Sequence, residues 1–209
     1  MGTLNVRKYP RGPLQENTYL ITDLHTDLCA VIDPGYFGDD IVWDIGEDNN
    51  LAYVILTHAH FDHFYSAEKY LNKFSNAKFI APKNDLELMN KDYSDEDYAQ
   101  GFNNVLCPKA DILVNENDSI TLGDTELTFI ETPGHTKGSM CILTDGNLFS
   151  GDTLFRFSVG NTAFETGNWD DLVDSIQNKL YVLNDNIIVY PGHGPITTIG
   201  EEKRGNPFV

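Results

Sequence analysis

The sequence predicts an α/β fold in which two β layers pack together and are flanked by helices. Strand-like segments come first, strands and helices then alternate, and the second half of the chain follows much the same order. The halves also share a motif, because Thr132-Pro133-Gly134-His135 and Tyr190-Pro191-Gly192-His193 each place a histidine behind Pro-Gly after an apolar strand. Two halves that end strands in this way indicate a two-layered β core.

Strands are expected where short apolar or β-branched runs are bounded by turn residues. These runs are residues 4–7, 18–21, 28–32, 52–56, 78–81, 112–114, 119–122, 126–130, 139–143, 147–150 and 186–190. Residues 91–104 are polar and poorly patterned, which indicates a loop or a frayed helix between the two halves.

Helices are expected at residues 39–48 and 65–74, and Pro82 suits the first position of a further helix. The clearest helix is 169–183, whose apolar residues recur along one stripe. Asn168 precedes it and is a preferred residue for capping a helix N-terminus.

Composition limits the class of protein and its partners. A chain of 209 residues with 41% hydrophobic residues fits one globular domain, residues 1–209, as a monomer or small homo-oligomer. The formal net charge of −18 repels phosphate backbones and anionic headgroups, so neither nucleic acid nor membrane is expected as a partner. No apolar segment at the N-terminus resembles an export signal, and the three cysteines lack metal-type spacing, so a reducing cytoplasmic location is expected.

Histidine and aspartate residues follow directly after several of the expected strands. They are His58, His60, Asp62 and His63 after 52–56, His135 after 126–130, Asp152 after 147–150, and His193 after 186–190. His25 alone among the six histidines stands in an ordinary polar turn. Loops at one edge of a sheet converge, and sites are commonly built there. We therefore expect these side chains to form a single site.

The spacing of these residues is suited to two metal ions. His58 and His60 are two positions apart, so on an extended segment they point the same way and can share one ion, which His135 completes. Asp62 and His63 follow at a bend and would face a second ion together with His193. The two oxygens of Asp152 can bridge both ions. Imidazole and carboxylate ligands without thiolate suit zinc, iron or manganese, and open coordination positions are typical of a catalytic site.

Two weaker interpretations of single residues remain beside this one. A lone His-x-His is common in polar loops, so the metal hypothesis depends on the full set in this order. Asp33, at the end of run 28–32, is in most proteins a turn former, although it could orient a metal ligand from behind.

At this point the motifs resemble those of the metallo-β-lactamase-fold hydrolase superfamily. The similar segments are Thr57-His58-Ala59-His60-Phe61-Asp62-His63, Pro133-Gly134-His135-Thr136, Ser150-Gly151-Asp152-Thr153 and Pro191-Gly192-His193-Gly194. The resemblance covers nearly the whole chain, and the tail is similar to short bacterial glyoxalase II-like proteins of the hydroxyacylglutathione hydrolase type. It implies a four-layer αββα sandwich of two mixed β-sheets flanked by helices, with a dinuclear site along one edge.

The resemblance also implies roles for the residues. It assigns His58, His60 and His135 to one divalent ion, and Asp62, His63 and His193 to the other, with Asp152 bridging. Zinc is the metal expected first, with iron or manganese as alternatives. In the implied reaction, a metal-bridging hydroxide that Asp62 helps to orient attacks the carbonyl of a small-molecule thioester such as S-lactoylglutathione, or of a related ester or lactone.

Other members of the superfamily differ at particular residues. Class B β-lactamases normally carry Cys in place of Asp152 and an export signal, flavodiiron oxygen reductases carry Glu in place of His60, and nucleases carry an inserted domain. Persulfide dioxygenases share the motif set but use a single iron, so a mononuclear-iron oxidoreductase is the alternative function. A binding role on an inactive fold is the third, although no ligand position is lost.

The substrate contacts are where this chain departs from the family pattern. Relatives often read Gly-Arg-Ser/Thr-Asp where this chain has Gly160-Asn161-Thr162-Ala163, so an Arg and an Asp are absent. Asn161 and the cations Lys137 and Arg156 are the candidate substrate-binding residues. With few cations near the site, glutathione as the thiol portion is a plausible expectation rather than a requirement of the motifs.

Overall fold

The computed structural model describes residues 4–46, 50–93 and 105–209 and contains two six-stranded sheets. The first sheet has the order β1-β2-β3-β4-β5-β6. Its strands are β1 (Leu4–Arg11), β2 (Glu16–Asp23), β3 (Cys29–Ile32), β4 (Leu51–Ile55), β5 (Lys78–Pro82) and β6 (Ile112–Val114). Strands β1 to β3 pair antiparallel, whereas β3 to β6 pair parallel, so the sheet is mixed.

The second sheet has the order β14-β13-β10-β9-β8-β7. Its strands are β7 (Ser119–Leu122), β8 (Thr125–Glu131), β9 (Met140–Thr144), β10 (Asn147–Gly151), β13 (Ile188–Pro191) and β14 (Thr197–Thr198). Strands β10 and β13 are parallel and the other neighbours antiparallel, so this sheet is mixed too. A separate hairpin joins β11 (Leu154–Phe155) to β12 (Ser158–Val159).

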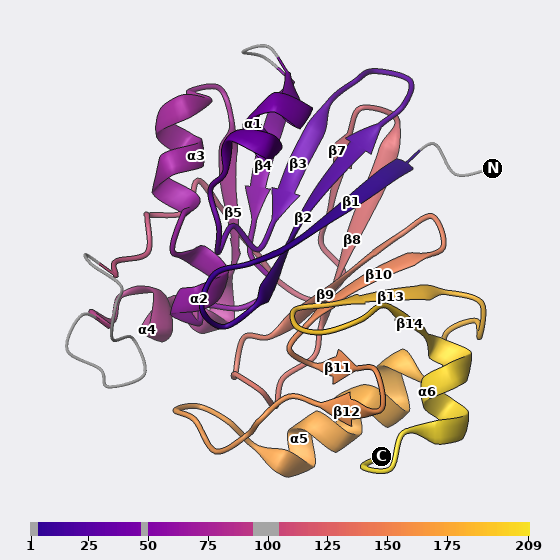
Figure 1. Ribbon diagram of the computed structural model, residues 1–209. Coiled ribbons are helices and arrows are strands. Elements are labelled where there is room, and N and C mark those ends of the chain that lie inside the picture. Colours follow the sequence, from indigo (N-terminus) through magenta and orange to yellow (C-terminus); the bar gives the residue numbers. More distant parts are fainter. Residues whose placement is uncertain (1–3, 47–49, 94–104) are drawn as a thin grey trace.

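Helices lie on the outer side of each sheet (Figure 1). They are α1 (Asp39–Ile45), α2 (Phe61–Phe64), α3 (Ala67–Lys73), α4 (Leu86–Met89), α5 (Trp169–Asp174) and α6 (Ile199–Gly205). Figure 1 places α1 and α3 beside the first sheet, and α5 and α6 at the opposite end of the molecule. No helix in the described ranges is long and apolar enough to cross a bilayer.

Three apolar clusters hold these layers together. The central cluster lies between the sheets, where Tyr19 of β2 meets Phe149 of β10 edge to face at 5.3 Å between ring centroids. A second cluster, which includes Tyr70, packs helices on the first sheet, and a third, which includes Leu172 and Ile176, packs α5 on the second. Burying such side chains is the main favourable term in folding. The three clusters separate four layers, which confirms the αββα sandwich.

The predicted helices are present but shorter than their sequence patterns. Asn168 caps α5, since its Oδ1 accepts hydrogen bonds from the backbone of Asp170 at 2.9 Å and Asp171 at 3.2 Å. The α-helix then continues as a π-helical segment, Ser175–Leu180. The helix predicted at 65–74 is α3, Ala67–Lys73, and the short helix α2, Phe61–Phe64, precedes it.

Two other predicted segments differ from the structure. Pro82 is the last residue of β5, and a 3₁₀ turn at Lys83–Asp85 precedes α4, so the proline ends a strand instead of starting a helix. The last long strand begins at Ile188, two residues later than predicted. Most of the polar segment 91–104 lies outside the described residues.

Candidate metal centre

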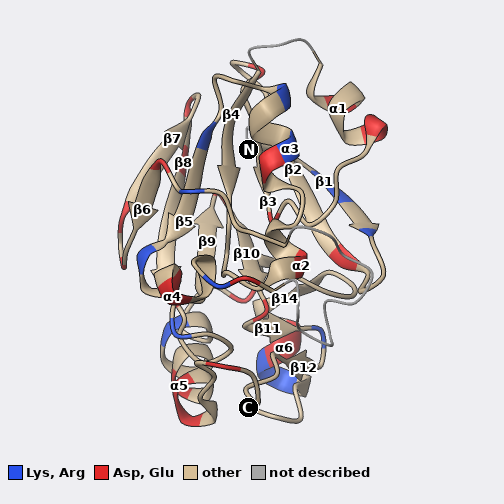
Figure 2. Cartoon of the chain, turned by 90° about the vertical axis from the view of Figure 1, so that its left-hand side faces the viewer, with Lys and Arg blue, Asp and Glu red and all other residues tan. Residues whose placement is uncertain are grey.

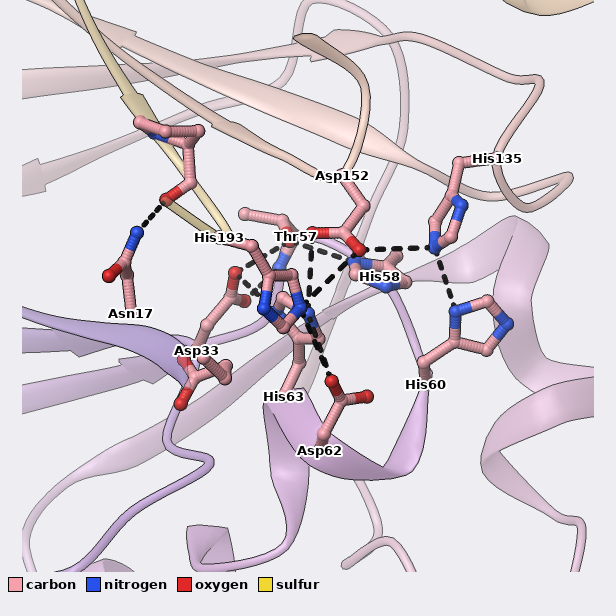
Figure 3. A network of polar contacts seen from close by, with 12 residues as sticks. Asn17, Asp33, Thr57, His58, His60, Asp62, His63, His135, Asp152 and His193 are labelled. Atoms are coloured by element: carbon pink, nitrogen blue, oxygen red, sulfur yellow. Dashed lines mark hydrogen bonds and ion pairs between the residues drawn. The ribbon is translucent and has the colours of Figure 1, made fainter. Parts of the chain in front are cut away.

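The candidate ligands converge at the edge where several strands end (Figure 3). His58 and His60 follow β4, Asp62 and His63 lie in α2, His135 follows β8, Asp152 follows β10 and His193 follows β13. Because β10 and β13 are parallel, and β8 runs in the same direction, their carboxyl ends share one edge. The two halves of the chain therefore supply ligands to one place.

The first candidate set consists of three imidazoles. His58, His60 and His135 have ligand atoms within 4.8 Å of one another. The closest pair is His60 Nδ1 and His135 Nε2, at 2.8 Å. These are the residues that the resemblance assigned to one ion.

The second candidate set combines one carboxylate with two imidazoles. Asp62, His63 and His193 also have ligand atoms within 4.8 Å of one another. Asp62 Oδ2 lies 3.3 Å from His193 Nε2 and 3.8 Å from His63 Nε2. The set matches the residues assigned to the other ion.

Asp152 faces both sets. Its Oδ2 lies 3.5 Å from His135 Nε2 and 3.6 Å from His193 Nε2, and its Oδ1 lies 3.4 Å from His63 Nε2. His135 belongs to the first set, and the other two belong to the second. A carboxylate in this position can place one oxygen on each of two ions.

Unpaired polar atoms show that the cluster is suited to cations. Among the described residues, the buried atoms His58 Nε2, His63 Nε2 and Asp152 Oδ1 have no hydrogen-bond partner. A buried polar atom without a partner costs about 1–3 kcal/mol, so such atoms are rare unless they serve a ligand. Nitrogen and oxygen ligands without thiolate fit zinc, iron or manganese.

Burial keeps the imidazoles of His58 and His60 uncharged. Burial, together with the neighbouring imidazoles, lowers the pKa of His58 well below its ordinary value. The same causes lower the pKa of His60 to about 3. Both imidazoles are therefore neutral at pH 7, which is the form that coordinates a metal.

The second set has a different charge balance. Burial acts to lower the pKa of His63, but Asp152, Asp62 and Asp33 outweigh it and raise the pKa well above its ordinary value. Burial acts to raise the pKa of Asp62, but His63 and His193 lower it below its ordinary value. The Asp62 carboxylate is thus ionised at neutral pH and carries the negative charge that a cation requires.

Asp33 orients the His63 ring through Nδ1, the ring nitrogen that does not face the other candidate ligands. Its Oδ2 lies 3.0 Å from His63 Nδ1, and its two oxygens accept hydrogen bonds from the backbone and the hydroxyl of Thr57, both at 2.8 Å. The side chain is buried. This contact turns His63 Nε2 toward Asp62 and Asp152, so the structure places Asp33 where the sequence hypothesis expected a supporting residue.

The sequence did not single out Asp85, which links two ligand loops. Its carboxylate is buried and accepts hydrogen bonds from Ala59 N at 2.9 Å, Thr136 Oγ1 at 2.8 Å and Gly138 N at 2.7 Å. Ala59 lies between His58 and His60, and Thr136 follows His135. No local pattern could have identified Asp85, because its partners are 26 to 53 residues away.

A cavity of about 520 Å³ opens onto the ligand cluster. His60, Asp62, His135, Asp152 and His193 form one side of its wall. The remaining described wall residues are Leu14, Phe61, Leu88, Lys91, Tyr93, Ala163, Phe164 and Glu165. The cavity therefore joins the candidate metal centre to a mostly apolar pocket.

The three predicted substrate-binding residues do not line this cavity. Lys137 is exposed, and its backbone N donates to Thr166 Oγ1 at 3.2 Å. Arg156 lies in the β11–β12 turn with its guanidinium 5.5 Å from the centroid of the Phe157 ring.

Asn161 contacts the site through its backbone rather than its side chain. Its carbonyl accepts a hydrogen bond from His135 Nδ1 at 2.7 Å, whereas its Oδ1 accepts one from Ala163 N at 3.0 Å. His25 lies elsewhere, 3.4 Å from the exposed Asp124. Lys91, Tyr93 and Phe164 are cavity residues that the sequence reasoning missed.

Comparison with known proteins agrees with this geometry. The family model of the metallo-beta-lactamase superfamily matches residues 11–193. Hydroxyacylglutathione hydrolase GloC from Haemophilus influenzae is 33% identical over 210 residues, which cover 99% of this chain and 98% of that protein.

Two solved structures are also similar to this chain. The B3 metallo-beta-lactamase BLEG-1 is 31% identical with a TM-score of 0.87, and the match covers 98% of this chain and 99% of that one. ETHE1 from Myxococcus xanthus is 29% identical with a TM-score of 0.78, covering 97% and 83%. With the fold, the ligand clusters and these matches together, the chain belongs to the metallo-beta-lactamase superfamily of metallo-hydrolases.

Proposed function

We propose that this protein is a dinuclear metal-dependent hydrolase of a thioester such as S-lactoylglutathione, or of a related small ester or lactone. The observation that carries the proposal is the pair of three-residue ligand sets, joined by Asp152, with members of both sets in the wall of one cavity. A site with two ions and an adjoining pocket is typical of hydrolases that act on a carbonyl or phosphoryl centre.

The ligand sets define which residues would hold the metals. His58, His60 and His135 would hold one ion; Asp62, His63 and His193 would hold the other; and Asp152 would contact both. Zinc is the metal we propose first, with iron and manganese as alternatives that the same donor atoms accept. When bound, two divalent ions supply a lowered water pKa and polarisation of the substrate carbonyl.

The carboxylates contribute orientation and proton transfer. Asp62 and Asp152 both line the cavity, so each can accept a hydrogen bond from a water molecule there. In the reaction, water adds its oxygen to the acyl carbon and the carbon–sulfur bond breaks. The products are a carboxylic acid, which ionises, and a free thiol. Among the described wall residues there is no Ser or Cys, which favours water over a side-chain nucleophile.

Two alternative activities are distinguished by the experiment described below. The similarity to BLEG-1 makes β-lactam hydrolysis one of them. The other is the mononuclear-iron persulfide dioxygenase activity that the motif resemblance also allows, and the similarity to ETHE1 keeps it a candidate.

The test is a substrate panel on metal-loaded protein. The panel contains S-lactoylglutathione, uncharged acyl thioesters, a lactone and a chromogenic cephalosporin, and oxygen uptake is measured separately with glutathione persulfide. We expect thioester cleavage that a chelator abolishes and added metal restores. Oxygen uptake with one iron per chain and no thioester cleavage would contradict the proposal, as would cleavage of the cephalosporin alone.

A further inference from the structure

The cavity wall beside the ligand cluster is apolar and aromatic. Leu14, Phe61, Leu88 and Phe164 contribute to it. The Phe164 ring lies edge to face with His60 at 5.6 Å between centroids, and with His135 at 6.4 Å. A substrate whose carbonyl is held at the ligand cluster would therefore have hydrophobic surface next to its acyl or thiol portion.

Among the Lys and Arg residues, a single side chain lines the cavity. The chain has 14 Lys and Arg residues, all within the described ranges, and of these Lys91 alone lines the cavity. Residues 94–104, which the structure does not describe, contain no Lys or Arg in their sequence. No other Lys or Arg side chain of this chain is thus placed to bind an anionic group in the cavity.

The charge of Lys91 is already compensated. Its Nζ lies 2.7 Å from Glu165 Oε2, and both residues line the cavity. The same Nζ lies 5.2 Å from the centroid of the Tyr93 ring, so the ammonium is held between a carboxylate and an aromatic face. The pair is electrically neutral, and a substrate carboxylate would have to displace Glu165 to reach Lys91.

The negative charge of the rest of the molecule also disfavours the binding of an anionic substrate. The formal net charge is −18, and acidic residues occur on helices and loops in both halves (Figure 2). A field of this sign lowers the local concentration of anions and slows their association. Glutathione has two carboxylates and one ammonium at neutral pH, so a glutathione thioester is an anion.

We propose that the cavity prefers thioesters without net negative charge over thioesters of an anionic thiol such as glutathione, because Glu165 compensates the charge of Lys91. The inference rests on the proposed thioester hydrolysis and narrows its substrate class. An uncharged thioester leaves the ion pair intact and places its chain against Phe61, Leu88 and Phe164. An anionic one must break the pair or place a carboxylate in the cavity with no cationic side chain as its partner, which is costly.

The test compares two substrates that share an acyl group. They are S-lactoylglutathione and the uncharged S-lactoyl-N-acetylcysteamine, and kcat/KM is measured for each on metal-loaded protein. We expect kcat/KM of the wild type to be roughly tenfold higher for the uncharged thioester. This ratio corresponds to about 1.4 kcal/mol. In Glu165→Gln and then Glu165→Lys, kcat/KM for the glutathione thioester should rise stepwise relative to the uncharged one, by about threefold or more per step.

A matched control and a charge-neutral double variant make the result specific. Glu116 pairs with Lys179 at 3.3 Å outside the cavity wall, so Glu116→Gln should leave the substrate ratio unchanged. The double variant Lys91→Gln/Glu165→Gln removes both charges, so the cavity still offers an anion no uncompensated Lys or Arg side chain, and the preference for the uncharged thioester should persist. A selective loss of glutathione thioester cleavage in the double variant would show that Lys91 binds the substrate carboxylate and would overturn the inference.

The two proposals fail in different ways. If the wild type cleaves both thioesters but prefers the glutathione one, this inference is wrong and thioester hydrolysis stands. If Glu165→Lys leaves the ratio unchanged, the compensation of Lys91 by Glu165 does not cause the preference and the inference is likewise wrong. If neither thioester is cleaved, the proposed thioester hydrolysis fails and the inference fails with it.

Discussion

The Asp85 carboxylate accepts a hydrogen bond from Thr136 Oγ1 at 2.8 Å across 51 residues of sequence. Through a second bond, from Ala59 N at 2.9 Å, the same carboxylate holds the loop of His58 and His60. One buried group thus fixes two separate loops that supply the first ligand set. The position of His135 relative to His60 depends on it.

Replacing Asp85 should therefore weaken metal binding at the first set. The Asp85→Asn variant presents an NH₂ group to at least one of the donors that the carboxylate served. We expect the affinity for one of the two metal ions to fall by roughly 10- to 100-fold, as is usual when a group supporting metal ligands is changed. The measurement is a competition titration against a chromophoric chelator.

Asp111→Asn is the matched control for this experiment. Asp111 also accepts a backbone hydrogen bond, from Phe79 at 2.9 Å, but it contacts neither ligand loop in the described hydrogen-bond network. The affinity of the Asp111→Asn variant for both metal ions should equal that of the wild type. Equal affinities for both ions in Asp85→Asn would show that the two loops hold their positions without the carboxylate.

The histidines provide a direct test of the site assignment. His58→Ala removes a buried imidazole of the first set, whereas His25→Ala removes an exposed one that pairs only loosely with Asp124, at 3.4 Å. Hydrolytic activity should be abolished in the first variant and unchanged in the second. Comparable kcat/KM values in the two variants would refute the assignment.

The lowered pKa of Asp23 predicts that the free energy of unfolding depends on pH, independently of the metal centre. The hydrogen bond from Thr125 Oγ1, at 2.6 Å, and those from Thr26 and the His25 backbone lower the pKa of Asp23 from 3.8 to about 2. A folded-state pKa below the unfolded value stabilises the fold above about pH 4, and this contribution is lost as the pH falls toward 2.

The Asp23→Asn variant should therefore be less stable than the wild type at pH 7, with a difference that shrinks as the pH falls from about 4 toward 2. Urea unfolding at a series of pH values, with matched metal content, gives the free energies of unfolding. Asp124→Asn is the control, because its side chain is largely exposed and contacts only His25 at 3.4 Å among the described ion pairs. A difference that grows on acidification would contradict the role of Asp23.

The sequence predicts the layers, and it predicts which histidines and aspartates the structure brings together at one edge, because both depend on local patterns. Apolar runs predict buried strands, and polar residues after such runs predict an edge, so the amino-acid order alone groups His58, His135 and His193. The helix boundaries were less accurate. The pattern at 65–74 gives the apolar face of α3 but not the break at Ser66, whose backbone N donates to Pro34 O at 2.8 Å.

The cavity wall was not predictable in the same way. Lys91 and Glu165 are 74 residues apart, and each alone reads as a solvated surface charge. Lys137 and Arg156 are closer in sequence to the ligands, which favoured them as substrate contacts, yet neither lines the cavity. Proximity in sequence places a residue near an edge but does not determine which way its side chain points.

The central claim is that two metal ions are held by two ligand sets, and metal content per chain tests it most directly. Elemental analysis of purified protein, loaded with zinc, iron or manganese and freed of excess metal, should give about two ions per chain and about one in His193→Ala. Thioester cleavage should be lost with the metal. A wild-type protein that cleaves the thioester with a single bound ion, or with none, would contradict the account.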